Sequence, residues 1–552
     1  MPRTTDLSAN FSRNYCALAM NQKELAQRVC LPSVDDHIVG EPPQLRIHRS
    51  RYSLSLSPEV VEQVGVHTPA ETILVFGVGL GELVVEVLRT NPNATVIAWD
   101  RDPVMLRKAM ERQDFSGAMY RGQLRLALGP DLIDVMGQAS ESVVYHPLLR
   151  QVYHLEADLF ERGLEAPRAL ICAGGLFVDD VAAGLQQQGL GVYTWDVQGL
   201  CTEELDRVVA QIEPVLVFSI NHVHGLAEVC HGHDLPLLVW EIDPCTDGLR
   251  PPGTDTHHVV IHTYREANVD RFRAAGFSNV VYTPLAANTT RRCPSPTEVE
   301  RGPEVCFVGA SMVAQSRSFR RQFLDAWVKC SENNPQARKQ GQQVLGGVLK
   351  AQRLRPRNYL IPILMQRHFD AFLAQAERFL VDDPVAMVAE MAAAERRLNI
   401  VAALGTEGIH VWGDPGWKAT QGRGVVYRGF AGHNQQLTDI YRRGRVHVDV
   451  NRLYQLDIVP MRVFDILACG GFLIAEHSPA LAELFELGVE VESWSSIPEL
   501  IDKVRHFRAH PEQAEAIALA GLKAVQERHS IQERVFEMLS DLPGKHEVPS
   551  VG

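Results

Sequence analysis

Short apolar stretches alternate with amphipathic ones along most of the chain. From Glu71 an apolar run, TILVFGVG, precedes a helix-like segment, GELVVEVLRTNP, and the pair repeats as ATVIAWD and DPVMLRKAMERQ. Apolar runs of this length between segments of helical periodicity predict parallel strands joined by crossover helices. The pattern continues weakly to about residue 160. We therefore expect a Rossmann-like N-terminal domain at residues 61–165, after a polar, irregular lead-in segment at 1–60.

Two further αβ regions follow. In residues 166–300 the expected strands are ALICAGG, GVYTWDV, VLVFSINH and PLLVWEID. In residues 301–540 they are EVCFVGA, IHVWGD, VVYRGF, VHVDVN and FLIAE, and a mostly helical insertion at about 315–398 separates the first from the rest. Residues 541–552 form a tail. The pattern predicts two doubly wound parallel sheets, whose ligands would bind at the carboxyl ends of the strands.

Composition narrows the class of protein. With 552 residues, three or four domains are expected, and 45% hydrophobic and 22% charged residues are typical of a globular chain. A net charge of −13 argues against nucleic acid as a partner. The 10 cysteines contain no CxxC pair and mostly lie in apolar runs, which indicates buried, reduced thiols. The chain shows neither a signal-peptide pattern nor an apolar run long enough to span a membrane, so we expect a cytoplasmic location.

The segment at 460–486, PMRVFDILACGGFLIAEHSPALAELFE, concentrates candidate chemistry. We expect a helix carrying Asp465, a break at Gly470-Gly471, an apolar strand, and a second helix with Ser478 as N-cap and Pro479 at its first position. Asp465 and Glu483 would then converge with two helix N-termini on one edge of the sheet, an arrangement suited to a nucleoside diphosphate sugar. Alternatively, the glycines only stop a helix and both acids are solvated.

The same segment resembles the signature of group 1 glycosyltransferases, in which an acidic residue, Ala-Cys-Gly, a strand and a second glutamate line the donor site. It is still more similar to the CgeB-like (spore maturation type) branch. The matching motifs cover about residues 300–540 outside the insertion: Phe307-Val308-Gly309, Gly413-Asp414-Pro415-Gly416-Trp417, Val448-Asp449-Val450-Asn451, Arg462-Val463-Phe464-Asp465, Ala468-Cys469-Gly470-Gly471-Phe472, and His529 with Arg534.

The resemblance implies roles for individual residues on the donor side. Glu483 would bind the nucleotide ribose, Asp465 the donor sugar, and Arg462 a phosphate. Gly309 would allow its loop to approach the diphosphate, with Arg317 or Arg320 adding positive charge, and Gly470 and Gly471 would complete the donor site. Asp465 stands where the family usually has glutamate, which shortens its reach.

Residues 169–290 resemble the acceptor-side domain of that branch, and the GT-B fold is implied for the pair of domains. Asn221, Glu241 and Asp243 follow apolar strands and should project into a cleft, together with His222 and Asn288. Asp243 or Glu241 could act as general base. Alternatively, Asp243 caps the turn at Pro244. The histidines at 222, 224, 231 and 233 with Cys230 could in principle bind zinc, but the resemblance implies no metal.

A glycine-rich loop marks the N-terminal domain. Gly77, Gly79 and Gly81 follow a strand and open a helix, and Asp100 ends the next strand, which is the arrangement that binds an adenosine-containing cofactor. The loop resembles the first motif of S-adenosylmethionine-dependent methyltransferases and the Rossmann core of Maf-type glycosyltransferases. The alternatives are a degenerate structural domain, a nucleotide site and an active methyltransferase.

These features together predict an α/β protein with a GT-B arrangement of two Rossmann-like domains, an additional N-terminal Rossmann-like domain and a helical insertion. The expected activity is transfer of a sugar from a nucleoside diphosphate sugar to an acceptor hydroxyl, on a protein such as a flagellin or on a glycan. A methyltransferase or bifunctional enzyme using S-adenosylmethionine, and a non-catalytic scaffold, are the alternatives.

Overall fold

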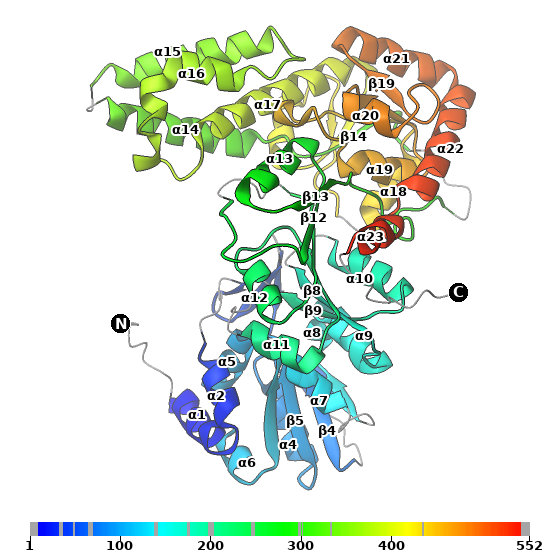
Figure 1. Ribbon diagram of the computed structural model, residues 1–552. Coiled ribbons are helices and arrows are strands. Elements are labelled where there is room, and N and C mark those ends of the chain that lie inside the picture. The colour runs from blue at the N-terminus through cyan, green and yellow to red at the C-terminus, as the bar shows by residue number, and fades with distance from the viewer. Residues whose placement is uncertain are drawn as a thin grey trace. The chain divides into compact units, whose positions relative to one another are not determined.

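The chain folds into two compact units (Figure 1). The computed structural model describes residues 9–31, 37–47, 50–64, 70–136, 142–173, 177–196, 204–243, 249–295, 300, 302–331, 334–432 and 435–542. Unit 1 comprises residues 1–263, 267–281 and 535–552, and unit 2 comprises residues 264–266 and 282–534. Cys201 and Cys245 lie outside the described residues.

The first sixty residues contain more regular structure than their polar pattern predicted. The elements are α1 (Ala9–Asn21), α2 (Lys23–Val29), the antiparallel strands β1 (Ile38–Val39), β2 (Gln44–Ile47) and β3 (Ser50–Ser53), and α3 (Pro58–Val64). Helix α1 buries Phe11, Ala17 and Leu18 in the same apolar cluster as Ile73 and Val75. A narrow apolar stripe on a short helix is a weak sequence signal. Here the helix is stable because a neighbouring sheet buries that stripe.

The first parallel sheet of unit 1 has the order β6-β5-β4-β7. Its strands are β4 (Thr72–Phe76), β5 (Thr95–Asp100), β6 (Leu124–Leu128) and β7 (Val143–Tyr145). The accompanying helices are α4 (Glu82–Thr90), α5 (Pro103–Arg112), α6 (Ser116–Tyr120), α7 (Leu132–Met136), α8 (Pro147–Val152) and α9 (His154–Arg162). In order of appearance this is a 3-2-1-4 arrangement, so the strand order reverses between β4 and β7, where open α/β sheets bind ligands.

The second parallel sheet of unit 1 has the order β13-β12-β11-β10-β8-β9. Its strands are β8 (Arg168–Ala173), β9 (Gly191–Asp196), β10 (Leu216–Ile220), β11 (Leu237–Glu241), β12 (Val259–Thr263) and β13 (Asn279–Tyr282). Its helices are α10 (Val178–Gln187), α11 (Leu205–Ile212), α12 (Leu226–Gly232) and α13 (Glu266–Ala275). The 2-1-3-4-5-6 order places the reversal between β8 and β10.

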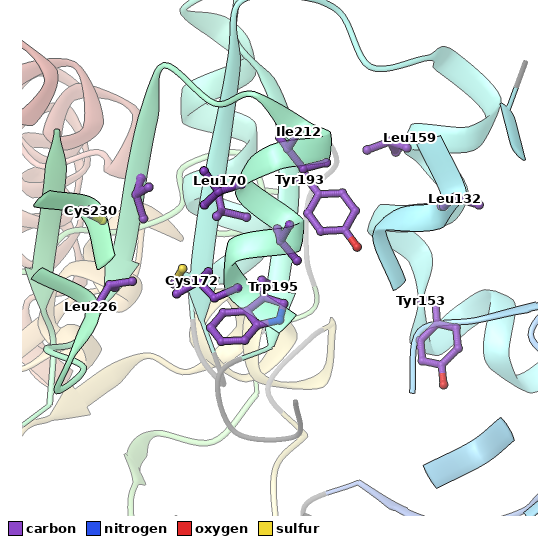
Figure 2. Close-up of a cluster of buried hydrophobic side chains, with 14 of the residues drawn as sticks. Leu132, Tyr153, Leu159, Leu170, Cys172, Tyr193, Trp195, Ile212, Leu226 and Cys230 are labelled. Carbon is purple, nitrogen blue, oxygen red and sulfur yellow. The ribbon is translucent and has the colours of Figure 1, made fainter. Parts of the chain in front are cut away.

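One apolar core joins the two sheets of unit 1. Figure 2 shows Tyr153 and Leu159, from the N-terminal αβ region, with Leu170, Tyr193 and Trp195 of the next sheet, all members of one buried cluster. The N-terminal region and the region predicted to be the acceptor side thus share a continuous core, so residues 61–165 do not fold as a compact unit of their own. The alternation of strands and helices gave no sign of this, because periodicity does not report which helix faces are shared.

Unit 2 is a parallel sheet of order β16-β15-β14-β17-β18-β19. Its strands are β14 (Val305–Val308), β15 (His410–Trp412), β16 (Val426–Tyr427), β17 (Val446–Val448), β18 (Leu473–Glu476) and β19 (Glu492–Trp494). The helices that follow β15 in the chain are α18 (Gln435–Arg443), α19 (Met461–Ala468), α20 (Pro479–Leu484), α21 (Ile497–Ala509), α22 (Pro511–Arg528) and α23 (Ile531–Ser540), the last of which ends in unit 1. The 3-2-1-4-5-6 order is that of a Rossmann fold, with its reversal between β14 and β17.

The helical insertion is confirmed. Between β14 and β15 the chain forms α14 (Val313–Cys330), α15 (Ala337–Arg353), α16 (Ile361–Leu373) and α17 (Pro384–Ala403). These helices enclose their own apolar cluster, in which Phe323, Phe369 and Phe372 pack edge to face. The α/β class with doubly wound parallel sheets is confirmed as well, since every strand pair of the three sheets with a defined register is parallel.

Candidate functional site

The carboxyl ends of β14 and β17 bring a basic cluster together at the strand-order reversal of unit 2. Arg462, in the first turn of α19, donates from Nη1 to the carbonyl oxygen of Val308 at 2.7 Å and from Nη2 to Oδ1 of Asp449 at 2.6 Å. The guanidinium therefore bridges the two strands at the place where a doubly wound sheet opens.

Asp449 directly follows β17 and is almost completely buried, with a side chain 1% exposed. Its Oδ1 accepts both hydrogen bonds from Arg462, whereas Oδ2 has no hydrogen-bond partner among the described residues. A buried carboxylate oxygen without a donor is costly. Such an atom at a strand-order reversal indicates a group that acquires its partner from a ligand.

Helix α17 of the insertion adds a second cation. Arg397 is buried and donates to the carbonyl oxygens of Ala310 and Val450, at 2.9 Å each. Burial, together with the nearby charges of Arg462 and Arg452, lowers the pKa of Arg397 to about 9. The mutual repulsion of neighbouring cations is relieved when an anion binds between them, so this cluster suits a polyanionic ligand such as a diphosphate.

Two glycines allow the loops after β14 and β15 to meet. A Cβ on Gly309 would lie 2.9 Å from Nη1 of Arg462, and one on Gly413 would lie 2.1 Å from the carbonyl oxygen of Gly309. Asp414 accepts from the amide and the hydroxyl of Ser311, each at 2.5 Å. Burial opposes ionisation of Asp414, but these hydrogen bonds outweigh it and hold its pKa below the ordinary value. The Gly-Asp-Pro-Gly-Trp turn thus fixes the loop that leads into α14.

The segment at 460–486 has the predicted elements. Helix α19 ends at Ala468, β18 follows, and α20 begins with Pro479 after Ser478, whose hydroxyl accepts from the amide of Leu481 at 3.1 Å. Glu483 is exposed on α20. Asp465 is buried, and its Oδ2 lies 3.2 Å from Nε of Arg292 in an ion pair whose side chains are 3% and 7% exposed.

Gly470 and Gly471 do not belong to this edge of the sheet, which corrects the prediction that they line the donor site. They connect the end of α19 to the start of β18, and Gly470 lines a pocket together with Arg445 and Val446, at the start of β17. A helix that follows a strand runs back along the sheet, so its last residues lie at the amino ends of the strands. Their role is to end α19, with Gly470 at a φ of 72°.

The two arginines predicted to add positive charge beside the diphosphate differ in their contacts. Arg317 is exposed in the second turn of α14, and Arg320 lies 3.6 Å from Glu395 in an ion pair. Asp449 carries a sequence signal typical of site residues, since it is an acid directly after an apolar strand. Arg397 had none, since it stands in an alanine-rich helix that the pattern marks only as an insertion.

In unit 1, the side chains of Glu241 and Asn221 form hydrogen bonds within the protein, at the ends of the sheet's strands. Glu241 is fully buried at the end of β11, where it accepts from the hydroxyl of Thr263 and from Nδ2 of Asn268. The expectation that it projects into an open cleft is wrong, because neighbouring elements supply donors that keep it inside. Oδ1 of Asn221 accepts from the amides of Ile242 and Asp243, at 2.8 and 3.0 Å, and so ties the ends of two strands together.

Asp243 is exposed immediately after this network, which leaves it the more accessible carboxylate. His222 packs against Phe272 and Phe277, and burial, with a smaller effect of His224, lowers its pKa to about 4. Asn288 belongs to unit 2, where Oδ1 accepts from the amides of Thr290 and Arg291. In the described part of the chain, no three His, Cys, Asp or Glu side chains are placed to hold a metal ion.

The glycine loop of the N-terminal sheet has the backbone of a cofactor site, but protein side chains occupy its surroundings. Gly77, Gly79 and Gly81 have φ values of 81°, 57° and 87°. A Cβ on Gly79 would lie 2.6 Å from the ring of His146, which directly follows β7 and is fully buried. The imidazole therefore fills the crevice between β4 and β7, where a cofactor would lie.

The carboxylate of Asp100, which was predicted to bind a ribose, likewise accepts its hydrogen bonds from the protein. It is fully buried, and it accepts from the amide of Val78 at 2.8 Å, the amide of Asp102 at 3.0 Å and the hydroxyl of Tyr153 at 2.9 Å. Burial raises its pKa to about 7 despite these hydrogen bonds. A ribose would have to displace Tyr153 and the backbone of the glycine loop.

One family model matches part of the chain, most of it in unit 2. Residues 368–540 match the family model described as Glycosyl transferase-like, and this stretch contains Arg397, Asp449 and Arg462. This part of the chain is a glycosyltransferase domain. No curated protein matches the chain significantly.

The solved structures to which this chain is similar share little sequence identity with it. Anabaena Alr3699/HepE in complex with UDP and glucose is 12% identical, covering 68% of this chain and 100% of that one, with a TM-score of 0.37. Sucrose-phosphate synthase from Thermosynechococcus elongatus is 10% identical (68% and 97% covered, TM-score 0.39), as is the T4 phage β-glucosyltransferase (68% and 99%, TM-score 0.36). With such TM-scores these superpositions are loose. Among the described residues, no helix of the glycosyltransferase is long and apolar enough to cross a membrane.

Proposed function

We propose that this glycosyltransferase transfers a sugar from a nucleoside diphosphate sugar to an acceptor hydroxyl, and that the donor binds at the carboxyl edge of the unit 2 sheet. The observation that carries the proposal is the pair of cations at the strand-order reversal, the buried Arg397 and the half-buried Arg462, inside the region that matches the glycosyltransferase model. The diphosphate would lie between them and the first amides of α14, with Gly309 giving it room.

Asp449 would complete this donor site. Its Oδ2, which has no hydrogen-bond partner among the described residues, can accept a hydrogen bond from a hydroxyl of the donor sugar. Glu483 is exposed and free to take the ribose hydroxyls, as its family resemblance implies. Asp465 would need to exchange Arg292 for a sugar hydroxyl, so we give it a supporting role in holding α19 in place.

The acceptor side is proposed for unit 1, as the GT-B resemblance implies. Asp243 is the proposed general base, because it is exposed while Glu241 is enclosed by Thr263 and Asn268. A protein such as a flagellin, or a glycan, is the proposed acceptor. We also propose that the chain belongs to the CgeB-like branch, because residues 300–540 carry motifs that resemble those of that branch.

Donor binding can be tested by thermal shift with UDP-, GDP-, dTDP- and CMP-sugars. One donor class should raise the melting temperature by mass action. Arg397→Met should weaken that donor at least tenfold, since a charge-assisted contact to phosphate is lost. Gly309→Ala should do the same by displacing Arg462.

Matched controls separate loss of binding from loss of fold. Arg355→Met removes an exposed arginine of the loop after α15, and Gly346→Ala adds a Cβ that meets nothing within 4 Å. Both should keep wild-type donor affinity. The proposal fails if no nucleotide sugar shifts the melting temperature, or if Arg397→Met binds the donor as wild type does.

A further inference from the structure

A second cavity in unit 2 lies under the helical insertion. It has a volume of about 160 Å³, is partly open, and is lined by residues of α15 and α17 and by residues at the end of β19 and the start of α21. Its lining includes five buried apolar side chains: Leu349, Ala392, Ile400, Leu453 and Trp494. None of Gly309, Asp449 and Arg462 lines it, so it is distinct from the proposed donor site.

The outer part of the lining contains three arginines and one carboxylate, that of Glu395. Arg353 and Arg357 are exposed lining residues from the end of α15 and the loop that follows it. Arg353 forms an ion pair with Glu395, with 2.7 Å between Nη2 and Oε2. Arg396, from α17, also lines the cavity; it forms an ion pair with Glu476, while its Nε is buried and has no hydrogen-bond partner among the described residues. The cavity thus combines an apolar interior with three arginines and a single carboxylate, so its lining has an excess of positive charge.

We infer that this cavity binds a small amphipathic anion, consisting of one aromatic ring or short alkyl group that carries a phosphate or carboxylate. The volume of the cavity limits the apolar part of the ligand to about one ring, because a cavity of about 150 Å³ holds a benzene molecule. The arginines set the charge, since a guanidinium pairs with phosphate and carboxylate oxygens. The indole of Trp494 supplies a flat wall for the ring.

The wall of the cavity also touches the donor side. Nε1 of Trp494 donates to the carbonyl oxygen of Asp449 at 3.1 Å, and Nη1 of Arg396 donates to that of Asn451 at 3.2 Å. Both acceptors belong to the segment that follows β17. A ligand in the cavity therefore contacts two side chains that hold the backbone beside the proposed donor carboxylate.

The inference can be tested with phenyl phosphate on the full-length chain, by titration calorimetry and ligand-observed NMR. We expect saturable binding with a Kd of about 1 mM or lower, and at least tenfold weaker binding of both inorganic phosphate and benzyl alcohol. Equal binding of inorganic phosphate would mean an ion site and overturn the inference. So would the absence of saturable phenyl phosphate binding.

Variants locate the binding. Ala392→Phe fills the cavity and should abolish phenyl phosphate binding. If that variant folds poorly, Asn399→Trp, at an exposed lining position, serves in its place and should weaken binding at least tenfold. Arg357→Gln should weaken binding about tenfold, whereas Arg355→Gln, an exposed neighbour outside the lining, should not change it. Phenyl phosphate binding that survives Asn399→Trp and Arg357→Gln but disappears in Arg397→Met would place it in the donor site and overturn the inference.

Discussion

The side chains around the glycine loop of unit 1 decide whether its Rossmann-like sheet can serve a cofactor. His146 fills the crevice beside Gly79, and Asp100 accepts three hydrogen bonds from the protein. A ribose-binding acid must keep its oxygens available, and this one does not. We therefore interpret the loop as a structural remnant of a cofactor fold, and propose no methyl transfer.

At the residue scale, S-adenosylmethionine should show no binding to the wild-type chain by calorimetry at about 1 mM ligand, a concentration high enough to reveal weak sites. Asp100→Ala should instead lower the free energy of unfolding by about 2 kcal/mol, because buried donors lose their acceptor. Asp158→Ala, at an exposed position, is the control and should be nearly neutral. Binding of S-adenosylmethionine that Asp100→Ala removes would show that the site is functional.

At the scale of elements, the first two helices are fixed to unit 1 by a buried ionic network. Arg28 of α2 donates to both carboxylate oxygens of Glu204 and of Asp131, and to the carbonyl oxygen of Leu128, with a side chain 6% exposed. Asn14 of α1 is buried and bonds the carbonyls of Met110 and Gln113. These contacts make the N-terminal segment part of the core of unit 1.

Arg28→Met should therefore cost about 3 kcal/mol, since it leaves Glu204 largely buried without its ion-pair partner and Asp131 paired only with Arg207, at 3.3 Å. Arg13→Met breaks an exposed ion pair with Asp114 and should cost no more than about 1 kcal/mol. Urea unfolding followed by circular dichroism measures both. Equal effects of the two variants would mean that α2 is not anchored through Arg28.

At the scale of the whole molecule, buried histidines in both units link stability to pH. Burial lowers the pKa of five of them from 6.5 to about 4: His146, His222, His262, His447 and His529. A base whose folded-state pKa is depressed stabilises the fold above its unfolded pKa, and that contribution is lost as pH falls from 6.5 towards 4. Asp100 acts in the opposite direction: its raised pKa favours the folded state at low pH, and that benefit is lost as pH rises towards 7.

We expect the melting temperature to fall between pH 7.5 and pH 5, with each buried histidine contributing about 1 kcal/mol at pH 5.5. His447→Gln should reduce the size of this fall, since glutamine cannot take up the proton in the unfolded chain. His233→Gln changes an exposed side chain and should leave the pH dependence as it is. A His447→Gln variant with an unchanged pH profile would contradict this explanation.

The sequence alone determined the local elements and the motifs. Apolar runs of four to six residues between amphipathic segments specify strands and helices because each period buries one face, and the Ser478-Pro479 start and the glycine end of α19 are local capping signals. The same local information identified the region that matches the glycosyltransferase model. It also provided Arg462 and Gly309 as donor candidates.

Only the tertiary structure decided which polar groups are available. Glu241 and Asp100 end strands, as functional acids do, yet both are satisfied by donors from segments more than twenty residues away. Arg397 enters the proposed donor site from an inserted helix, and Gly470 and Gly471 leave it because α19 runs back along the sheet. Periodicity reports which face of an element is buried, but the partners of a buried charge depend on how distant segments pack, and that packing determines which groups can meet a ligand.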